Sequence, residues 1–234
     1  MPARFTHIKD TSISSSDPIR ILFVSDTHGP IQITSLPPKD EFDIMCHAGD
    51  WFPDPSGRLR NADVVGYQRD FLRYEASCLA AFLGDTPFVF TLGNHDYLNT
   101  SLVEEELRSS GVNVINPNDR VQALSIRERT LSFRGFRYIP WIHGGFCGEL
   151  DDVELELRTK ALREQDCDVL ISHCPPSGKL SRGYGNDHLR DNFLCDNAPK
   201  VNLVGHIHET GGRDEMIGRT LVVNAAKKTV IVEV

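Results

Sequence analysis

The sequence predicts a mixed α/β fold, and two observations carry this prediction. The first half of the chain alternates short apolar runs with helical patterns, and the second half contains stretches of alternating polar and apolar residues. A chain of 234 residues with 40% hydrophobic content can bury about 70% of its unfolded surface around one core. We therefore expect a polar lead-in over residues 1–18, with one short strand at residues 5–8, and a single domain over residues 19–234.

The first half predicts three strands and two helices. The apolar runs at residues 19–24, 43–48 and 88–92 each end in a polar segment, which is typical of a buried strand that runs into a loop. Residues 62–84 place apolar side chains at helical spacing, and residues 101–110 predict a shorter helix that Gly111 ends.

The second half is richer in strands. Residues 121–126 and 130–138 alternate and suggest an antiparallel pair, and the charged segment 149–165 predicts a second amphipathic helix. The runs at residues 168–172 and 200–204 again end in polar segments, and residues 220–224 and 229–234 predict two final strands.

The polar segments after these apolar runs contain most of the residues that can carry chemistry. They are Asp26-Thr27-His28, Gly49-Asp50, Gly93-Asn94-His95-Asp96, His173 and Gly205-His206-Ile207-His208. Residues two apart in an extended segment point the same way, so Asp26 and His28 can reach one ion together. In open α/β sheets, sites tend to lie at the carboxyl ends of strands, which is where all these segments fall.

This donor set suits a pair of metal ions that cleaves a phosphoester. Such a reaction needs an activated nucleophile, neutralisation of charge on the phosphoryl oxygens and a proton for the leaving group. Two cations roughly 3.5–4 Å apart supply the first two needs, and a free histidine can supply the third. Oxygen and imidazole donors indicate Mn, Fe, Zn or Ni.

The five segments, in this order, resemble those of the calcineurin-like metallophosphoesterase superfamily, and the resemblance extends from Ile21 to about Ala225. His173-Cys174-Pro175-Pro176 and the later Gly-His-Ile-His-Glu segment are most similar to the small single-domain phosphodiesterase branch. The resemblance implies a four-layer α/β/β/α sandwich of two mixed β-sheets flanked by helices. It also implies a hydroxide between two metals as the nucleophile.

The resemblance assigns the metal ligands in two groups that share Asp50 as the bridge. The first ion is held by Asp26, His28, Asp50 and His208, and the second by Asp50, Asn94, His173 and His206.

His95 is left free of metal and is implied as the general acid, with Asp96 as the carboxylate that orients its imidazole. His7, His47, His143 and His188 lie outside the ligand set, and a structural role is the preferred interpretation for them. Glu209 and Asn224 are further candidates for contacts around the site.

The segment 175–191 follows a ligand and carries Arg182, His188 and Arg190. These side chains could contact a substrate phosphate or base, or the segment could be a solvated loop that ends in a helix near residues 187–193. Both interpretations are open.

Composition excludes several classes of protein. The formal net charge of −8 gives no global basic field, so a polymeric nucleic acid is disfavoured as a partner. No apolar run approaches the length of about 18 residues that a membrane helix needs. The six cysteines form no CxxC pair, which favours reduced thiols in the cytoplasm.

We expect a metal-dependent phosphoric ester hydrolase that acts on a small-molecule or nucleotide phosphodiester. Protein phosphatases of the superfamily carry an arginine in two of their motifs, and here Gly49-Asp50-Trp51 and Leu92-Gly93-Asn94 lack it. A phosphomonoesterase or protein phosphatase stays as the alternative reaction, and an inert interaction module on the same fold as the alternative class. The native metals and the oligomeric state are open.

Overall fold

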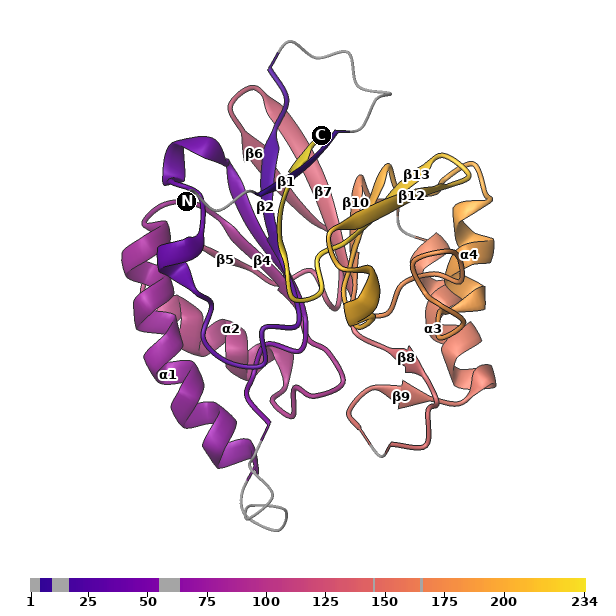
Figure 1. Ribbon diagram of the computed structural model, residues 1–234, viewed down its shortest axis with the longest axis horizontal. Helices are drawn as coiled ribbons and strands as arrows, with labels where there is room; N and C mark the ends of the chain where they lie inside the picture. Colours follow the sequence, from indigo (N-terminus) through magenta and orange to yellow (C-terminus); the bar gives the residue numbers. More distant parts are fainter. Residues whose placement is uncertain (1–4, 10–16, 55–63, 145, 165) are drawn as a thin grey trace.

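The computed structural model describes residues 5–9, 17–54, 64–144, 146–164 and 166–234. In this part of the chain, two six-stranded sheets lie face to face (Figure 1). The first has the order β1-β14-β2-β3-β4-β5 and the second the order β12-β13-β11-β10-β7-β6. All neighbouring strands are parallel except for the pairs β14–β2, β12–β13 and β6–β7.

The strands of the first sheet are β1 (Thr6–Lys9), β2 (Arg20–Val24), β3 (Ile44–Ala48), β4 (Phe88–Thr91), β5 (Val114–Ile115) and β14 (Thr229–Glu233). Those of the second are β6 (Gln122–Ile126), β7 (Arg129–Phe136), β10 (Val169–Ser172), β11 (Val201–Val204), β12 (Arg213–Ile217) and β13 (Thr220–Asn224). The strands β8 (Ile139–Pro140) and β9 (Glu149–Leu150) pair with each other. The helices are α1 (Val64–Leu83), α2 (Thr100–Ser109), α3 (Asp152–Arg163) and α4 (Asp187–Phe193), with short 3-10 turns η1 (Ile33–Ser35), η2 (Lys39–Glu41) and η3 (His208–Thr210).

Alternation along the strands divides the buried side chains into three apolar layers. Phe23 and Cys46 of the first sheet meet Phe133 of the second in the central layer. Their neighbours along the strands face outward, where α1 and α2 cover the first sheet and α3 and α4 cover the second (Figure 1). The result is the four-layer α/β/β/α sandwich that the resemblance implied.

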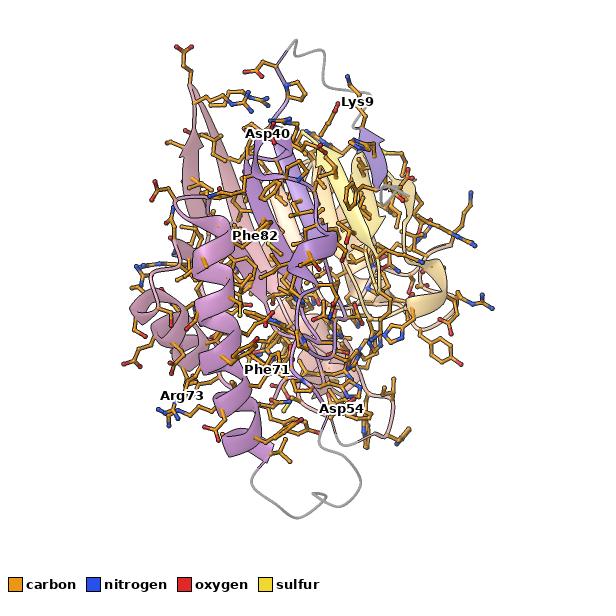
Figure 2. The ribbon with its side chains drawn as sticks, turned by 60° about the vertical axis from the view of Figure 1, so that its left-hand side comes forward. Lys9, Asp40, Asp54, Phe71, Arg73 and Phe82 are labelled. Carbon is orange, nitrogen blue, oxygen red and sulfur yellow. The ribbon has the colours of Figure 1, made fainter. Side chains whose placement is uncertain are left out.

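Helix α1 illustrates how the sequence pattern produces this packing. Its buried residues Leu72, Ala76, Leu79 and Leu83 recur every three or four positions, so they form one stripe that lies on the sheet. Phe71 and Phe82 pack against the same layer from the flanks of this stripe and are labelled along the helix in Figure 2. The predicted helix over 62–84 is confirmed for its described residues, since 62 and 63 lie outside them.

One predicted element needs correction, and one strand was missed. The segment 149–165 is not helical throughout, because Glu149–Leu150 is strand β9 and the Asp151 carboxylate accepts a hydrogen bond from Glu154 N at 2.9 Å, which starts the helix at Asp152. The sequence analysis also missed β12, whose exposed Arg213, Asp214 and Met216 hide the strand pattern. An edge strand commonly carries charged residues because they discourage pairing with other chains.

Strand β1 lies within the segment that we expected to be a lead-in. It pairs in parallel with β14 from Thr6↔Val230 to Lys9↔Glu233 and forms the edge of the first sheet. Ile8 is buried in the central apolar layer. The first sheet therefore extends to residues that precede position 19.

Asp168 provides a test of how the second sheet is held together. Its carboxylate accepts hydrogen bonds from Ser132 N and Ser132 Oγ at 2.9 and 2.7 Å and pairs with Lys200 Nζ at 2.8 Å. Burial raises its pKa, but the bonds from Lys200 and Ser132 outweigh burial and hold the pKa below its usual range. A lowered pKa in the folded state stabilises the fold at neutral pH, and this stabilisation is lost as the pH falls.

We expect Asp168→Asn to lower the free energy of unfolding by about 1–2 kcal/mol at pH 7. The difference in the free energy of unfolding between this variant and the natural sequence should shrink as the pH falls below about 4, the usual pKa of an aspartate. Urea unfolding at pH 7 and pH 3.5 measures both values. Asp166→Asn changes an exposed neighbour and is the control; an equal loss for both variants at pH 7 would show that the Asp168 contacts contribute nothing.

Candidate metal centre

Loops at the carboxyl ends of five parallel strands meet at one end of the molecule. β2, β3 and β4 of the first sheet lead to Asp26 and His28, to Asp50 and to Asn94, respectively, and β10 and β11 of the second lead to His173, His206 and His208. Figure 2 shows Asp54, which follows β3, at the end of the molecule opposite Lys9 and Asp40. The sandwich thus brings the segments of both sheets to one place.

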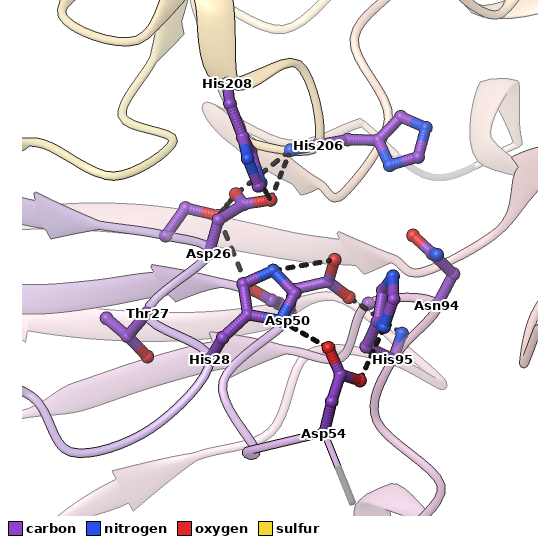
Figure 3. A network of polar contacts seen from close by, with 12 residues as sticks. Asp26, Thr27, His28, Asp50, Asp54, Asn94, His95, His206 and His208 are labelled. Atoms are coloured by element: carbon purple, nitrogen blue, oxygen red, sulfur yellow. Dashed lines mark hydrogen bonds and ion pairs between the residues drawn. The ribbon is translucent and has the colours of Figure 1, made fainter. Parts of the chain in front are cut away.

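The first group of donors is Asp26, His28 and His208, whose ligand atoms lie within 4.8 Å of one another. Asp26 is fully buried, and its Oδ1 lies 3.2 Å from His208 Nε2 (Figure 3). Its carboxylate also accepts hydrogen bonds from Ser25 Oγ at 2.6 Å and from His206 N at 3.0 Å. Burial raises the pKa of Asp26, but the hydrogen bonds from His208 and Ser25 and the charge of His173 together outweigh burial and hold this pKa below its usual range.

The second group is Asp50, His173 and His206. His173 is fully buried, and its Nε2 lies 3.3 Å from Asp50 Oδ2 and 2.9 Å from Asn94 Oδ1. The other ring nitrogen, Nδ1, lies 2.8 Å from the carbonyl oxygen of Ala48, to which it donates. Because that bond holds the proton on Nδ1, the lone pair of Nε2 is available to a metal ion.

Asp50 belongs to the second group and also lies close to the first. Its Oδ2 is 3.7 Å from His28 Nε2 on one side and 3.3 Å from His173 Nε2 on the other. Its Oδ1 accepts a hydrogen bond from His95 N at 2.8 Å, which fixes the carboxylate plane. Burial raises the pKa of Asp50, but the charge and hydrogen bond of His173 outweigh this and hold it well below its usual range.

The backbone at the candidate ligands is strained in the same way at four places. Asp26, His28, Asp50 and His206 have φ values of 56°, 45°, 51° and 66°, in the left-handed region that residues other than glycine avoid. Such a conformation costs on the order of 1 kcal/mol or more per residue and is common at functional sites. The strain turns each side chain out of the strand direction and toward the shared centre.

The glycines that precede the candidate ligands allow neighbouring segments to pack closely, and only one of them makes a turn with a positive φ. Gly49 has a φ of 95°, but Gly93 and Gly205 have no positive φ. A Cβ on Gly93 would lie 2.2 Å from Asp50 Oδ1, and one on Gly205 would lie 2.2 Å from Asp26 Oδ2. Both glycines therefore let the end of a neighbouring strand contact a candidate metal-binding carboxylate directly.

We expect Gly93→Ala to displace the Asp50 carboxylate and to lower the free energy of unfolding by about 1–3 kcal/mol. Metal affinity should fall as well, because a shift of Oδ1 also moves Oδ2, the oxygen that lies near both His28 and His173. Gly111→Ala is the control for metal binding, since its Cβ would meet open space although its φ is positive. Calorimetric titration with Mn²⁺ measures the affinity; equal metal binding by both variants would contradict this packing role.

The carboxylate and imidazole donors of these groups suit divalent metal ions. Each group offers carboxylate and imidazole atoms within bonding reach of a common point, and the buried His28 Nδ1 has no hydrogen-bond partner among the described residues. Burial lowers the pKa of His206 to about 4, so this imidazole is neutral at pH 7, as a metal ligand must be. Burial lowers the pKa of His173. The negative charges of Asp50 and Asp26 outweigh burial and raise this pKa to about 9, so the electrostatic potential at the site favours positive charge.

His95 lies beside the two groups, and its carboxylate partner differs from the predicted one. Its Nδ1 is 2.7 Å from Asp54 Oδ1 (Figure 3). Asp54 Oδ2 also lies 3.4 Å from His28 Nδ1, which places Asp54 in a third group with His28 and His95. Sequence reasoning missed Asp54, although a second aspartate four residues after Asp50 was a signal that could have found it.

The predicted orienting role of Asp96 is not what these contacts show. One of its oxygens accepts hydrogen bonds from Trp51 N and Phe52 N, both at 2.9 Å, and the other accepts one from Gly93 N at 2.7 Å. Burial and the charge of Asp50 raise the pKa of Asp96 to about 6. Through these hydrogen bonds, Asp96 joins the loop after β3 to the loop after β4. Consecutive residues of a turn point in different directions, so Asp96 does not reach the imidazole of its neighbour His95.

Two further polar residues brace the loops that carry the ligands. His47 is fully buried and lies between Gly49 N, which donates to its Nδ1 at 3.1 Å, and the Thr27 hydroxyl, 3.3 Å from its Nε2. Asn224 donates to Ile207 O at 2.8 Å and so supports the segment between His206 and His208. Glu209 is exposed on η3.

The three predicted substrate-contacting residues lie outside the three donor groups. His188 pairs with Asp152 at 2.9 Å, and Arg190 donates to Ser177 O at 2.6 Å, both at helix α4. Arg182 is exposed and has a φ of 50°. The helix that we considered at residues 187–193 is present. In it, His188 and Arg190 contact Asp152 and the Ser177 carbonyl.

The fold and the donor set define a metal-dependent phosphoester hydrolase. The calcineurin-like phosphoesterase profile matches residues 19–210, and the chain belongs to this family.

Among solved structures, the chain is similar to TT1561 of Thermus thermophilus, with 15% identity, a TM-score of 0.60 and coverage of 90% of each chain. It is also similar to the phosphopantetheinyl hydrolase PptH of Mycobacterium tuberculosis, with 12% identity, a TM-score of 0.54 and coverage of 91% of this chain and 90% of that one. These likenesses show the shared fold. No curated protein matches the chain in sequence. Within the described residues, every helix is too short or too polar to cross a membrane.

Proposed function

We propose that this protein hydrolyses a small-molecule or nucleotide phosphodiester with two divalent cations, Mn, Fe, Zn or Ni. The observation that carries the proposal is the position of Asp50, whose Oδ2 lies 3.7 Å from His28 Nε2 in the first sphere and 3.3 Å from His173 Nε2 in the second. Asp26, His28 and His208 would complete the first sphere, and Asn94, His173 and His206 the second. When bound, the cations supply Lewis acidity, which neutralises phosphoryl charge and lowers the pKa of a coordinated water.

The residues of the chain have distinct tasks in this reaction. His95 holds the proton that the leaving oxygen receives, and Asp54 holds the His95 ring through Nδ1 so that Nε2 faces the substrate. The Ala48 carbonyl accepts a hydrogen bond from Nδ1 and so keeps the His173 ring in place. Because Asp26 and Asp50 are almost fully buried, water competes little for their oxygens, which strengthens their hold on cations.

A diester is favoured over a phosphoprotein because the segments Gly49-Asp50-Trp51 and Leu92-Gly93-Asn94 lack the arginine that protein phosphatases of the superfamily carry there. The net charge of −8 also opposes binding of a polymeric nucleic acid. An inert interaction module is disfavoured, since all seven ligand positions carry competent donors. The six cysteines are all free thiols, in keeping with a proposed location in the reducing cytoplasm.

The proposal is tested by removing metals from the purified protein, reloading it with Mn²⁺, Fe²⁺, Zn²⁺ or Ni²⁺, and screening mono- and diesters, including 2′,3′- and 3′,5′-cyclic nucleotides. We expect hydrolysis only after reloading and a preference for diesters. Full activity of the metal-free protein would refute the mechanism, and a preference for monoesters would favour the alternative reaction.

A further inference from the structure

A hollow of about 420 Å³ adjoins the metal centre on the side of Asp26 and Thr27. Its walls come from the end of β2, the segment around η1, the turn before β14 and the residues at the start of β1. The apolar part of the wall is formed by Phe5, Val24, Pro30, Ile31 and Leu36. The size lies in the range of about 300–1,000 Å³ that is typical of small-molecule sites.

Two lysines lie at this hollow, in the turn before β14. Lys227 and Lys228 are exposed, and no described carboxylate forms an ion pair with either of them. In a chain whose formal charge is −8, unpaired cations beside a phosphoester site set the local potential that a negative substrate meets.

Lys227 is held in place by the backbone. It has a φ of 57°, its N donates to Ser25 O at 3.1 Å, and Lys228 N donates to Ala225 O at 2.9 Å. This conformation favours glycine or asparagine, so a lysine is retained here at an energetic cost. Ser25 directly precedes Asp26, and Asp26 and Lys227 line the same hollow, so Lys227 lies next to the first group of donors.

The hollow and the proposed general acid lie on different sides of the first sphere. Figure 3 shows Thr27 and His95 on opposite sides of His28. A leaving group that takes its proton from His95 therefore lies away from the hollow, and the group that stays on phosphorus lies toward it.

We propose that this hollow binds the retained organic group of the substrate and selects a group that is apolar or aromatic and carries a second negative charge, which Lys227 holds. The inference rests on the proposed function, because it takes the metal centre as the place of cleavage. The apolar surface of the retained group is removed from water when it enters the hollow, and its second negative charge pairs with the Lys227 ammonium.

The shape of the hollow is tested with two neighbouring tryptophan variants. Ser35 lines the hollow and Thr34 does not, although both are exposed residues of η1. We expect Ser35→Trp to raise the KM for bis(p-nitrophenyl) phosphate at least fivefold and to leave that for methyl p-nitrophenyl phosphate nearly unchanged, because only the first has a large retained group. Thr34→Trp should change neither. Equal behaviour of the two variants would overturn the assigned position.

The charge is tested with thymidine 5′-(p-nitrophenyl phosphate) and its 3′-phosphorylated form, which differ by one anionic group. We expect Lys227→Gln to raise the KM of the 3′-phosphorylated substrate roughly three- to tenfold and to leave that of the other unchanged. Lys160→Gln, on α3, is the control. Equal effects of Lys227→Gln on both substrates would overturn the role of Lys227.

A binding measurement separates this inference from the proposed function. Thymidine 3′,5′-bisphosphate should bind the metal-loaded protein, and Lys227→Gln and Ser35→Trp should weaken this binding in calorimetry. If cleavage fails but both variants weaken binding, the hollow stands and the proposed function falls. If cleavage proceeds and neither variant changes binding or KM, the proposed function stands and the hollow is not the subsite.

Discussion

Asp50→Ala is expected to lower kcat by at least roughly 10³-fold and to abolish the retention of both metal ions. The reason is geometric: Asp50 Oδ2 lies near His28 Nε2 and His173 Nε2 at once, so its removal would open both proposed coordination spheres. The loss should exceed that of any other single ligand, because each of the others serves one sphere. Metal content after gel filtration and the rate of diester hydrolysis measure the two effects.

Asp43→Ala is the matched control for this prediction. Asp43 immediately precedes β3, which ends just before Asp50, and it pairs with Arg20 and Arg127 away from the metal centre. We expect this variant to lose stability but to keep two metal ions per chain. A turnover of Asp50→Ala within tenfold of the natural sequence would remove Asp50 from its bridging role.

His95→Ala is expected to slow the hydrolysis of esters with poor leaving groups by about 10²–10⁴-fold. Esters of p-nitrophenol should lose much less, because p-nitrophenolate leaves without a proton. The dependence of log kcat on leaving-group pKa should therefore become steeper in this variant. Asp54→Asn should change the slope in the same direction by a smaller amount, since Asp54 acts through the His95 ring.

His7→Ala, which changes an exposed histidine on β1, is the control for the leaving-group series. Its slope should match that of the natural sequence. An equal loss of His95→Ala on good and poor leaving groups would argue against proton donation. A uniform loss in Asp54→Asn would mean that the aspartate contributes to metal binding through His28, and that it does not position His95.

Much of the fold could be predicted because each ligand follows a short apolar run. Such a run, with its polar end, is typical of parallel strands, and parallel strands align their carboxyl ends. The sequence did not reveal β12, because its alternating pattern is masked by charged residues at a sheet edge, nor the two-residue strands β8 and β9. The spacing of apolar residues also does not determine how two sheets pack against each other. The four-layer sandwich was expected only because of the family resemblance.

The sequence predicted candidate ligands that the structure brings together, but it did not predict the contacts that support them. Adjacent positions suggested that Asp96 holds His95. In the structure Asp54 contacts that imidazole, and Asp96 accepts hydrogen bonds from backbone amides. The close approach of Gly93 and Gly205 to carboxylates depends on contacts between distant segments. Such contacts have no local signature in the chain.

The central claim is that Asp50 joins two cation spheres, one on each side of its carboxylate. Electron paramagnetic resonance of the manganese-loaded protein tests it directly, because two Mn²⁺ ions that share a ligand give an exchange-coupled signal. We predict this signal at two Mn²⁺ per chain, and its absence in Asp50→Ala. A signal of isolated Mn²⁺ at full loading, unchanged by Asp50→Ala, would contradict the account.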